Sequence, residues 1–229
     1  MTDLFYTISR LVGTPFKYRI EGLENIVYGQ PKVFISNHAG SIGPLSILIS
    51  LPVRLHPWVI AEMVDIPRTA DYLYQDFVLP AWHLDGHIGK RVSYLLAPIA
   101  VSVINSVQPV AVDRNRGIFR AAFKQSLDLL CAGENLLIFP ENPGREEYGF
   151  HEIRPFLGGF CWLGRMYLNA TGKPLTIQPM AVYPPNRRMI LDVPVTLDLS
   201  GDYRVAIDRS INELQVIIMR LYKKIKTLA

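Results

Sequence analysis

The sequence predicts an α/β fold in which a mainly parallel central sheet is flanked by helices. Short apolar runs typical of buried strands alternate with longer segments of helical spacing through the middle of the chain. Of the 229 residues, 49% are hydrophobic and 19% are charged, which supports a sizeable core. Three strand-like runs are closely followed by ionisable residues, as in sheets that bind ligands beyond the carboxyl ends of their strands. We therefore expect a single domain over residues 1–229.

The first part of the chain predicts two strands, a helix and a third strand. Residues 17–23 alternate polar and apolar side chains, and residues 32–36 form a short apolar run. Residues 44–51 predict a helix with proline in its first turn, where a missing N–H costs least. Residues 53–63 are mostly apolar and predict a strand. Residues 1–16 have no long apolar run, so they predict a short helix, interfacial or packed, and not a secretory signal.

The middle of the chain predicts two helix–strand units after an irregular segment. Residues 64–90 are polar and aromatic, and we expect an irregular insertion there. Residues 92–106 predict a helix and residues 109–112 a strand. Residues 118–131 have apolar side chains at helical spacing and stop before a glycine that can cap the helix. Residues 135–139 are an apolar strand.

The last part of the chain predicts a helix, a pair of strands and a final helix. Residues 155–171 predict a helix that stops before a glycine. Residues 176–183 and 188–195 predict strands joined by a Pro-Pro-Asn turn, and therefore an antiparallel pair. A Ser-x-x-Glu capping box predicts the last helix over 210–228, with one packing face and one basic face.

Charge and hydropathy narrow the class of protein. The formal net charge of +4 suits an anionic membrane face or a phosphorylated ligand. The basic residues are too scattered to indicate nucleic acid, so no such partner is expected. Residues 33–53 and 92–112 lack charge, but prolines and polar residues interrupt both stretches. They predict buried elements and not membrane spans.

The cysteines and most histidines offer no metal site. Cys131 and Cys161 lie in apolar, helix-like contexts and predict buried free thiols in a reducing compartment. His83 and His87 have the spacing of a helical metal site. A glycine between them and the loop-like context favour no metal.

His38 is the strongest candidate for a catalytic residue. It follows the strand 32–36, on a turn that leads into a helix, where the helix dipole favours negative charge. That setting suits a neutral imidazole, which accepts a proton from a hydroxyl. The alternative is a histidine that only caps the turn.

Charged residues follow two further strands. An arginine at a strand end, as at Arg114, can hold a phosphate with two hydrogen bonds, or it can face solvent or pair with Asp113. Glu141 can bind or orient a polar substrate beside Arg145, a second anion-binding group. The alternative for these two is a helix cap and a surface pair.

Five segments taken in order resemble the phospholipid/glycerol acyltransferase family, the lysophosphatidic-acid acyltransferase-like group. The likeness runs from about residue 18 to about residue 195, and each motif alone is weak whereas the ordered set is specific. The segments are IEGLENI, FISNHAGSIG, PVAVDRNRG, LLIFPENPGRE and IQPMAVYP.

The resemblance implies roles for individual residues. Asn37 and His38 match the family's N-H-x-x-x-x-D motif, in which the His is the base that activates an acceptor hydroxyl. Arg114 matches an Arg that contacts the acceptor phosphate. The third motif matches at Phe-Pro-Glu, but its ending is one residue longer, so Arg145 is displaced by one position. The implied catalytic residues are His38 and Glu141, and the implied substrate-binding residues are Asn37, Arg114, Arg145, Pro140 and Ser41.

Gly43 stands where the family's first motif has Asp. An Asp paired with a catalytic His fixes the tautomer and stabilises the imidazolium, and its loss can cost about four powers of ten in rate. Three alternatives follow. Another carboxylate reaches His38, with Glu141 favoured over Asp113; the His acts undirected; or the site binds a lipid or thioester without turnover. Ser41 can orient the ring but cannot stabilise its charge comparably.

The resemblance implies an O-acyltransferase of the 1-acylglycerol-3-phosphate acyltransferase type. Such an enzyme moves a fatty acyl group from acyl-CoA or acyl-carrier protein to a hydroxyl of a glycerolipid-type acceptor, a lysophospholipid or glycerol phosphate. It implies no cofactor and no metal, and a cytoplasmic location, peripheral on the inner face of the membrane. The alternatives are a catalytically impaired lipid- or thioester-binding protein on the same fold, and acyl transfer to a non-glycerolipid acceptor such as an amine or a sugar hydroxyl.

Overall fold

The computed structural model describes residues 7, 14, 17–40, 42–113, 119–142, 153–197 and 199–228. The chain forms two compact units, each described here by itself. One unit comprises Met1–Val12 and His56–Ala122, and the other comprises Gly13–Leu55 and Phe123–Ala229. The expected interfacial helix within residues 1–16 falls almost wholly outside the described residues. That residues 1–229 form a single domain stays a prediction.

The larger unit is built on a mixed, mainly parallel sheet. β2 is parallel to both of its neighbours, β5 and β6, and β1 is parallel to β7. β7 and β8 run antiparallel to β6, which confirms the antiparallel pair expected at the Pro-Pro-Asn turn. The strands are β1 (Arg19–Glu21), β2 (Lys32–Ile35), β5 (Asn135–Ile138), β6 (Thr176–Tyr183), β7 (Arg188–Leu191) and β8 (Val195–Thr196).

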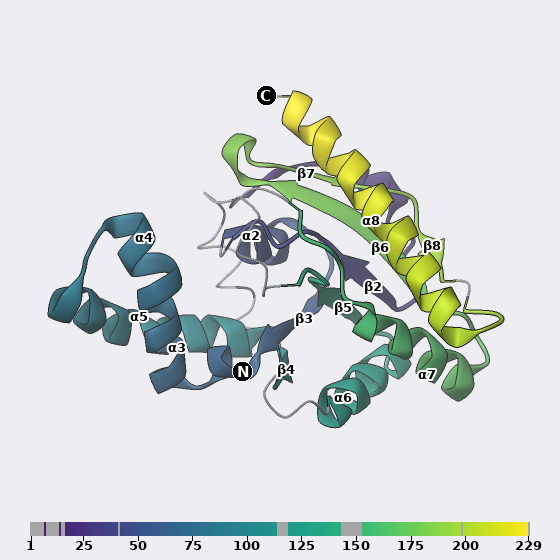
Figure 1. Cartoon of the computed structure of the whole chain (residues 1–229), viewed down its shortest axis with the longest axis horizontal. Helices are drawn as coiled ribbons and strands as arrows, with labels where there is room; N and C mark the ends of the chain where they lie inside the picture. Colours follow the sequence, from purple (N-terminus) through teal and green to yellow (C-terminus); the bar gives the residue numbers. More distant parts are fainter. Residues whose placement is uncertain are drawn as a thin grey trace. The chain divides into compact units, whose positions relative to one another are not determined.

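Alternation along these strands gives the sheet two buried faces. Phe34 and Leu137 point to one face, where they join a cluster that includes Ile47 and Leu51 beside helix α2 (Ile42–Ser50). The next side chains along β2, Val33 and Ile35, are also fully buried and point the opposite way. Helix α8 (Tyr203–Thr227) lies across β6 and β7, as Figure 1 shows in yellow. The α/β class with a mainly parallel sheet flanked by helices is thus confirmed.

The remaining helical segments of the larger unit connect these strands. Helix α7 ends at Gly172, whose φ of 70° is the left-handed conformation expected of a glycine cap. It begins at Cys161 and not at residue 155, because the preceding residues form a bridge described below. The segments are the turns η2 (Leu23–Asn25), η5 (Gly158–Phe160) and η6 (Pro184–Asn186), with helices α6 (Arg120–Cys131), which continues from the smaller unit, and α7 (Cys161–Thr171).

The smaller unit combines a parallel strand pair with helices. Strand β3 (Leu55–Ile60), which enters from the larger unit, pairs in parallel with β4 (Val110–Val112), and helix α3 (Ile66–Leu73) packs on α5 (Gly86–Ser106). The turns η3 (Ala61–Val64) and η4 (Tyr74–Val78) and the short helix α4 (Leu79–Trp82) complete it.

The irregular insertion expected over residues 64–90 is therefore wrong. Small side chains, Ala70 on α3 and Gly89 and Ser93 on α5, are fully or nearly fully buried where these helices pack. A Cβ on Gly89 would lie 2.8 Å from the ring of Tyr74. The polar and aromatic composition suggested an irregular segment, whereas α3 and α5 form helices that pack on each other at these small residues.

Two further expectations are corrected. The last helix begins at Tyr203 and not at 210, because Asp202 caps it by accepting hydrogen bonds from the backbone N–H groups of Arg204 and Val205. Ser210 is buried inside this helix. Cys161 is buried as expected, but Cys131 is exposed at the end of α6. In the part of the chain that the structure describes, no helix is long and apolar enough to cross a membrane.

Candidate active site

The parallel pairing of β2 and β5 brings the first and third motifs together. Ile35 is the register partner of Ile138, and His38 and Glu141 each lie three positions further along their chains. Because parallel strands end at the same edge of a sheet, the two motifs emerge side by side in the larger unit.

Glu141 is held between two backbone N–H groups. Its Oε1 accepts a hydrogen bond from the backbone N–H of His38 at 2.8 Å, and its Oε2 accepts one from the backbone N–H of Arg154 at 3.3 Å. Burial raises the pKa of the Glu141 carboxyl above its ordinary value, and the two N–H groups and the Arg154 charge offset part of that rise. Glu141 therefore contacts the main chain of His38. That a carboxylate partners the imidazole ring stays a prediction.

The His38 ring packs against the third motif as well. It meets the ring of Phe139 edge-on, with 5.1 Å between ring centroids and 75° between ring planes. The half-buried imidazole thus rests on the residue that leads from β5 towards Glu141. Two contacts from one neighbouring segment fix the position of this turn.

The turn after His38 has a constrained backbone. Ala39 has a φ of 48° and Gly40 a φ of 69°, so two successive residues are in the left-handed region. For a residue with a Cβ, such as Ala39, this conformation costs on the order of 1 kcal/mol. Helix α2 then begins at Ile42, as the sequence predicted within two residues.

Gly43 has a steric reason to be glycine. A Cβ built on this buried residue would lie 2.2 Å from the carbonyl oxygen of His38, far inside van der Waals contact. The first turn of α2 therefore sits directly on the His38 main chain. An Asp at this position requires the backbone to move, so the glycine is part of how this turn packs.

Asn37 joins the site to strand β6. Its side-chain amide donates to the carbonyl of Val182 at 2.9 Å, and its side-chain oxygen accepts from the N–H of the same residue at 2.8 Å. Strand β2 ends at Ile35, so it no longer pairs with β6 beside Val182. The Asn37 side chain makes the two hydrogen bonds to Val182 that a neighbouring strand would make. Asn37 is buried, and its role in substrate binding stays a prediction.

A short bridge supports the third motif. Glu141 pairs with Phe156 in an antiparallel bridge, the Asn142 N–H donates to the Pro155 carbonyl, and the Leu157 N–H donates to the Pro140 carbonyl. The buried Pro140 thus has a main-chain partner, and its expected contact with substrate stays a prediction.

Sequence reasoning did not include Arg154 in the site. It lies 13 residues after Glu141, outside every quoted motif, and its charge and N–H both act on that carboxylate. The local signal for Arg154 in the sequence is its position just before Pro155, next to the Glu141–Phe156 bridge.

Several predicted residues cannot be placed. Ser41, Arg114 and Arg145 lie outside the described residues. Asp113 belongs to the smaller unit. Among the described residues, no group of three or more His, Cys, Asp or Glu side chains is arranged to hold a metal ion.

The fold is of the α/β class with a mainly parallel sheet, and it resembles the fold of a glycerolipid acyltransferase. It is similar to the crystal structure of the 1-acyl-sn-glycerophosphate (LPA) acyltransferase PlsC from Thermotoga maritima, with a TM-score of 0.57 and 12% sequence identity. The match covers 98% of this chain and 80% of that chain. No family model and no curated protein matches the sequence.

Proposed function

We propose that the protein is an acyltransferase that moves a fatty acyl group from acyl-CoA or acyl-carrier protein to a hydroxyl of a glycerolipid-type acceptor. The observation that carries the proposal is the contact between His38 and Glu141 at the ends of adjacent parallel strands. The overall similarity to a solved acyltransferase structure and the ordered motifs of the sequence support it.

In this proposal the neutral imidazole of His38 accepts the proton of the acceptor hydroxyl. The oxygen attacks the thioester carbonyl, the C–S bond breaks, and the thiol leaves with the proton that His38 returns. The positive end of α2, which begins four residues after His38, favours the negative charge that develops on the carbonyl oxygen. Glu141 holds the His38 main chain in place. Arg114 and Arg145 are proposed to bind the anionic acceptor.

Thiol release tests this function. Purified protein is given palmitoyl-CoA or palmitoyl-acyl-carrier protein with a panel of lysophospholipids, glycerol phosphate, amines and sugars. Free thiol and acylated product are then measured. His38→Ala should abolish product, whereas His87→Ala, at an exposed histidine in the smaller unit, should not. Product that persists in His38→Ala, or none from any acceptor in the wild type, contradicts the proposal. Product from an amine or sugar alone would identify a non-glycerolipid acceptor.

A catalytically impaired binding protein is the second candidate. Gly43 favours it, because the carboxylate that the family places there is absent and the packing at His38 excludes it. This candidate predicts that the wild type binds palmitoyl-CoA, detected by calorimetry, with no thiol release above the background of His38→Ala. It also predicts that His38→Ala leaves the function of the protein in cells unchanged. Catalytic turnover would contradict it.

A further inference from the structure

Seven basic residues from three distant segments gather at one end of the larger unit. β7 runs antiparallel to β6, and β1 runs parallel to β7, so β1 and β7 begin where β6 ends. The last turns of α8 lie over the same end, where the side-chain amide of Asn186 donates to the carbonyl of Ile225 at 2.9 Å. We call the set the basic end: Lys17, Arg19, Arg187, Arg188, Lys223, Lys224 and Lys226.

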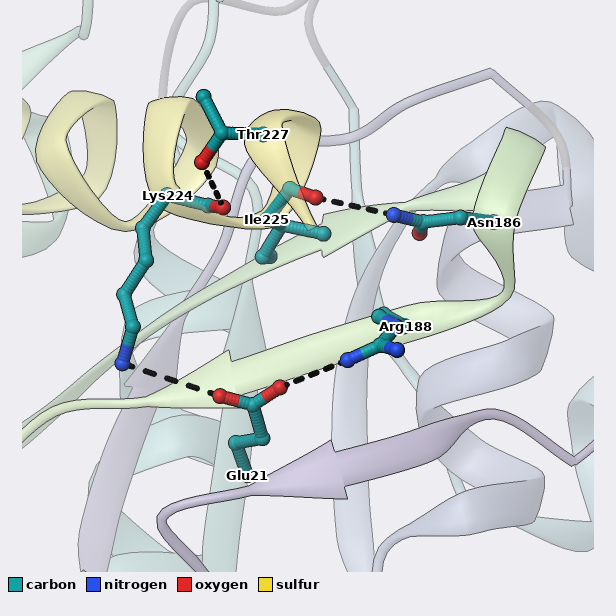
Figure 2. A network of polar contacts seen from close by, with 6 residues as sticks. All are labelled: Glu21, Asn186, Arg188, Lys224, Ile225 and Thr227. Atoms are coloured by element: carbon teal, nitrogen blue, oxygen red, sulfur yellow. Dashed lines mark hydrogen bonds and ion pairs between the residues drawn. The ribbon is translucent and has the colours of Figure 1, made fainter. Parts of the chain in front are cut away.

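Hydrogen bonds fix these segments to one another. The N–H of Arg19 donates to the carbonyl of Arg187 at 2.9 Å, and the Arg187 guanidinium donates to the Lys17 carbonyl at 3.4 Å. Figure 2 shows the contact with α8, in which Glu21 lies between Arg188 at 3.0 Å and Lys224 at 3.7 Å. Glu21 is the one acidic residue in this network. The cluster therefore keeps a strong positive excess, and all of its cations except Arg188 are exposed.

The basic end lies at the same end of the sheet as His38. Asn37 bonds to Val182, and the next residue, Tyr183, is the register partner of Arg188. β2 and β7 lie on either side of β6, so β2, which leads to His38, and β7, which begins at Arg188, are two strand spacings apart, about 10 Å. Tyr183 also meets Tyr222 of α8 edge-on at 5.5 Å.

We propose that the basic end docks the protein on an anionic lipid bilayer, with the His38 end of the sheet turned towards the lipid. The proposal deepens the proposed function and rests on it, because a bilayer is where a glycerolipid acceptor resides. Charge complementarity carries it, since clustered Lys and Arg side chains at a bilayer surface are attracted to anionic headgroups. A rigid, mostly exposed cluster beside the site would hold the catalytic turn near the headgroups.

Vesicle co-sedimentation of the full chain tests the docking. Wild type should bind vesicles that mix phosphatidylcholine with phosphatidylglycerol, should bind phosphatidylcholine alone much less, and should dissociate as salt is raised. The test variant is Lys223→Gln with Lys226→Gln. Both side chains are exposed, and neither forms an ion pair among the described residues, so the substitutions remove charge without breaking an ion pair. Removing these two charges should weaken partitioning on the order of 30-fold.

The matched control removes two charges elsewhere on the same unit. Lys173 precedes β6 at the opposite end of the sheet, and Arg204 lies in the first turn of α8, about 33 Å along the helix from Lys226. Lys173→Gln with Arg204→Gln should leave partitioning within about twofold, because these charges lie more than a Debye length from the docked surface. Circular dichroism melts check that both double variants fold.

The outcomes separate the docking from the reaction. Equal loss in both double variants, no binding to anionic vesicles, or no loss in the test variant would overturn the proposal. Binding of acyl-carrier protein through the basic end, with no vesicle binding, would also overturn it. Acyl transfer in detergent micelles should survive Lys223→Gln with Lys226→Gln. Vesicle binding should survive His38→Ala. Failure of the docking proposal can therefore be distinguished from failure of the proposed function.

Discussion

The backbone N–H of His38 and the Oε1 atom of Glu141 lie 2.8 Å apart, although 103 positions separate the two residues in the chain. The two residues follow adjacent parallel strands, so the sheet itself sets their separation. The bond ties the turn of the candidate base to a half-buried carboxylate, which also accepts a hydrogen bond from the N–H of Arg154.

Glu141→Gln tests this tie through activity. A carboxamide has one acceptor oxygen for two facing N–H groups, so either His38 or Arg154 loses its hydrogen bond. Displacement of a catalytic group by about 1 Å can cost on the order of 100-fold in rate, and we expect a loss of that size in kcat. Steady-state kinetics measure it, and Glu213→Gln, at an exposed carboxylate on α8, is the control. An unchanged kcat would mean that the turn does not need Glu141.

Glu141 also makes stability depend on pH. Its pKa is raised in the folded state by burial, so between the ordinary value of 4.5 and the raised folded pKa the folded chain binds more protons than the unfolded chain. The free energy of unfolding should therefore fall as pH rises through this window. Urea unfolding across the acidic range should show this slope in the wild type and a weaker slope in Glu141→Gln. Parallel pH profiles for the two proteins would contradict the assignment.

Asn37→Ala should destabilise the fold strongly. It leaves both the N–H and the carbonyl of Val182 without their buried partner, at about 1–3 kcal/mol for each unsatisfied group. Asn25→Ala is the comparison, because Asn25 gives a single part-buried bond to the Leu191 carbonyl and should cost about 1 kcal/mol. Chemical denaturation measures both. Similar losses in the two variants would mean that the Asn37 pair contributes little beyond an ordinary hydrogen bond.

Gly43→Ala and Gly43→Asp should both lose stability and activity. Each adds a Cβ that would lie 2.2 Å from the His38 carbonyl oxygen, so the turn and α2 must separate. We expect a cost of about 1–3 kcal/mol, typical of overpacking. Gly159→Ala is the control, since a Cβ there would meet nothing within 4 Å. A large rate gain in Gly43→Asp would show instead that the backbone moves to accept the side chain and that the rest of the site can use the added carboxylate.

The two cysteines should react very differently. Cys131 is exposed, whereas Cys161 is fully buried, and burial raises the pKa of its thiol to about 12. A thiol reagent should label Cys131 rapidly in the folded protein and should label Cys161 only after unfolding. Mass spectrometry of the labelled peptides identifies the sites. Rapid native labelling of Cys161 would mean that the α7 region opens on the timescale of the reaction.

The pairing of the first and third motifs was within reach of sequence reasoning. Short apolar runs set β2 and β5, and parallel strands bring their following residues to one edge, so His38 and Glu141 were expected at one site. The glycine cap of α7 and the antiparallel β6–β7 pair followed from local chemistry in the same way. These features depend on signals within about ten residues.

One missed feature depends on a contact between separate segments, and two others depend on local backbone geometry. Helices α3 and α5 pack through small residues such as Ala70 and Gly89, and the sequence of neither segment shows this contact. A Ser-x-x-Glu pattern at 210 looked like a cap, but Asp202 begins the helix seven residues earlier than expected. The closeness of Gly43 to the His38 carbonyl is set by the backbone conformation of the turn between them. The sequence therefore shows an absent carboxylate but not why it is absent.

Asn37 and Val182 are 145 positions apart, and this has a consequence for how the protein is made. Synthesis delivers His38 early, but the strand and the carboxylate that fix its turn emerge much later. A nascent chain therefore carries Asn37 and His38 for most of its synthesis before the residues that hold their turn exist. A chain that terminates before β6 lacks the partner of the Asn37 side chain, so we expect it not to hold the His38 turn in this geometry.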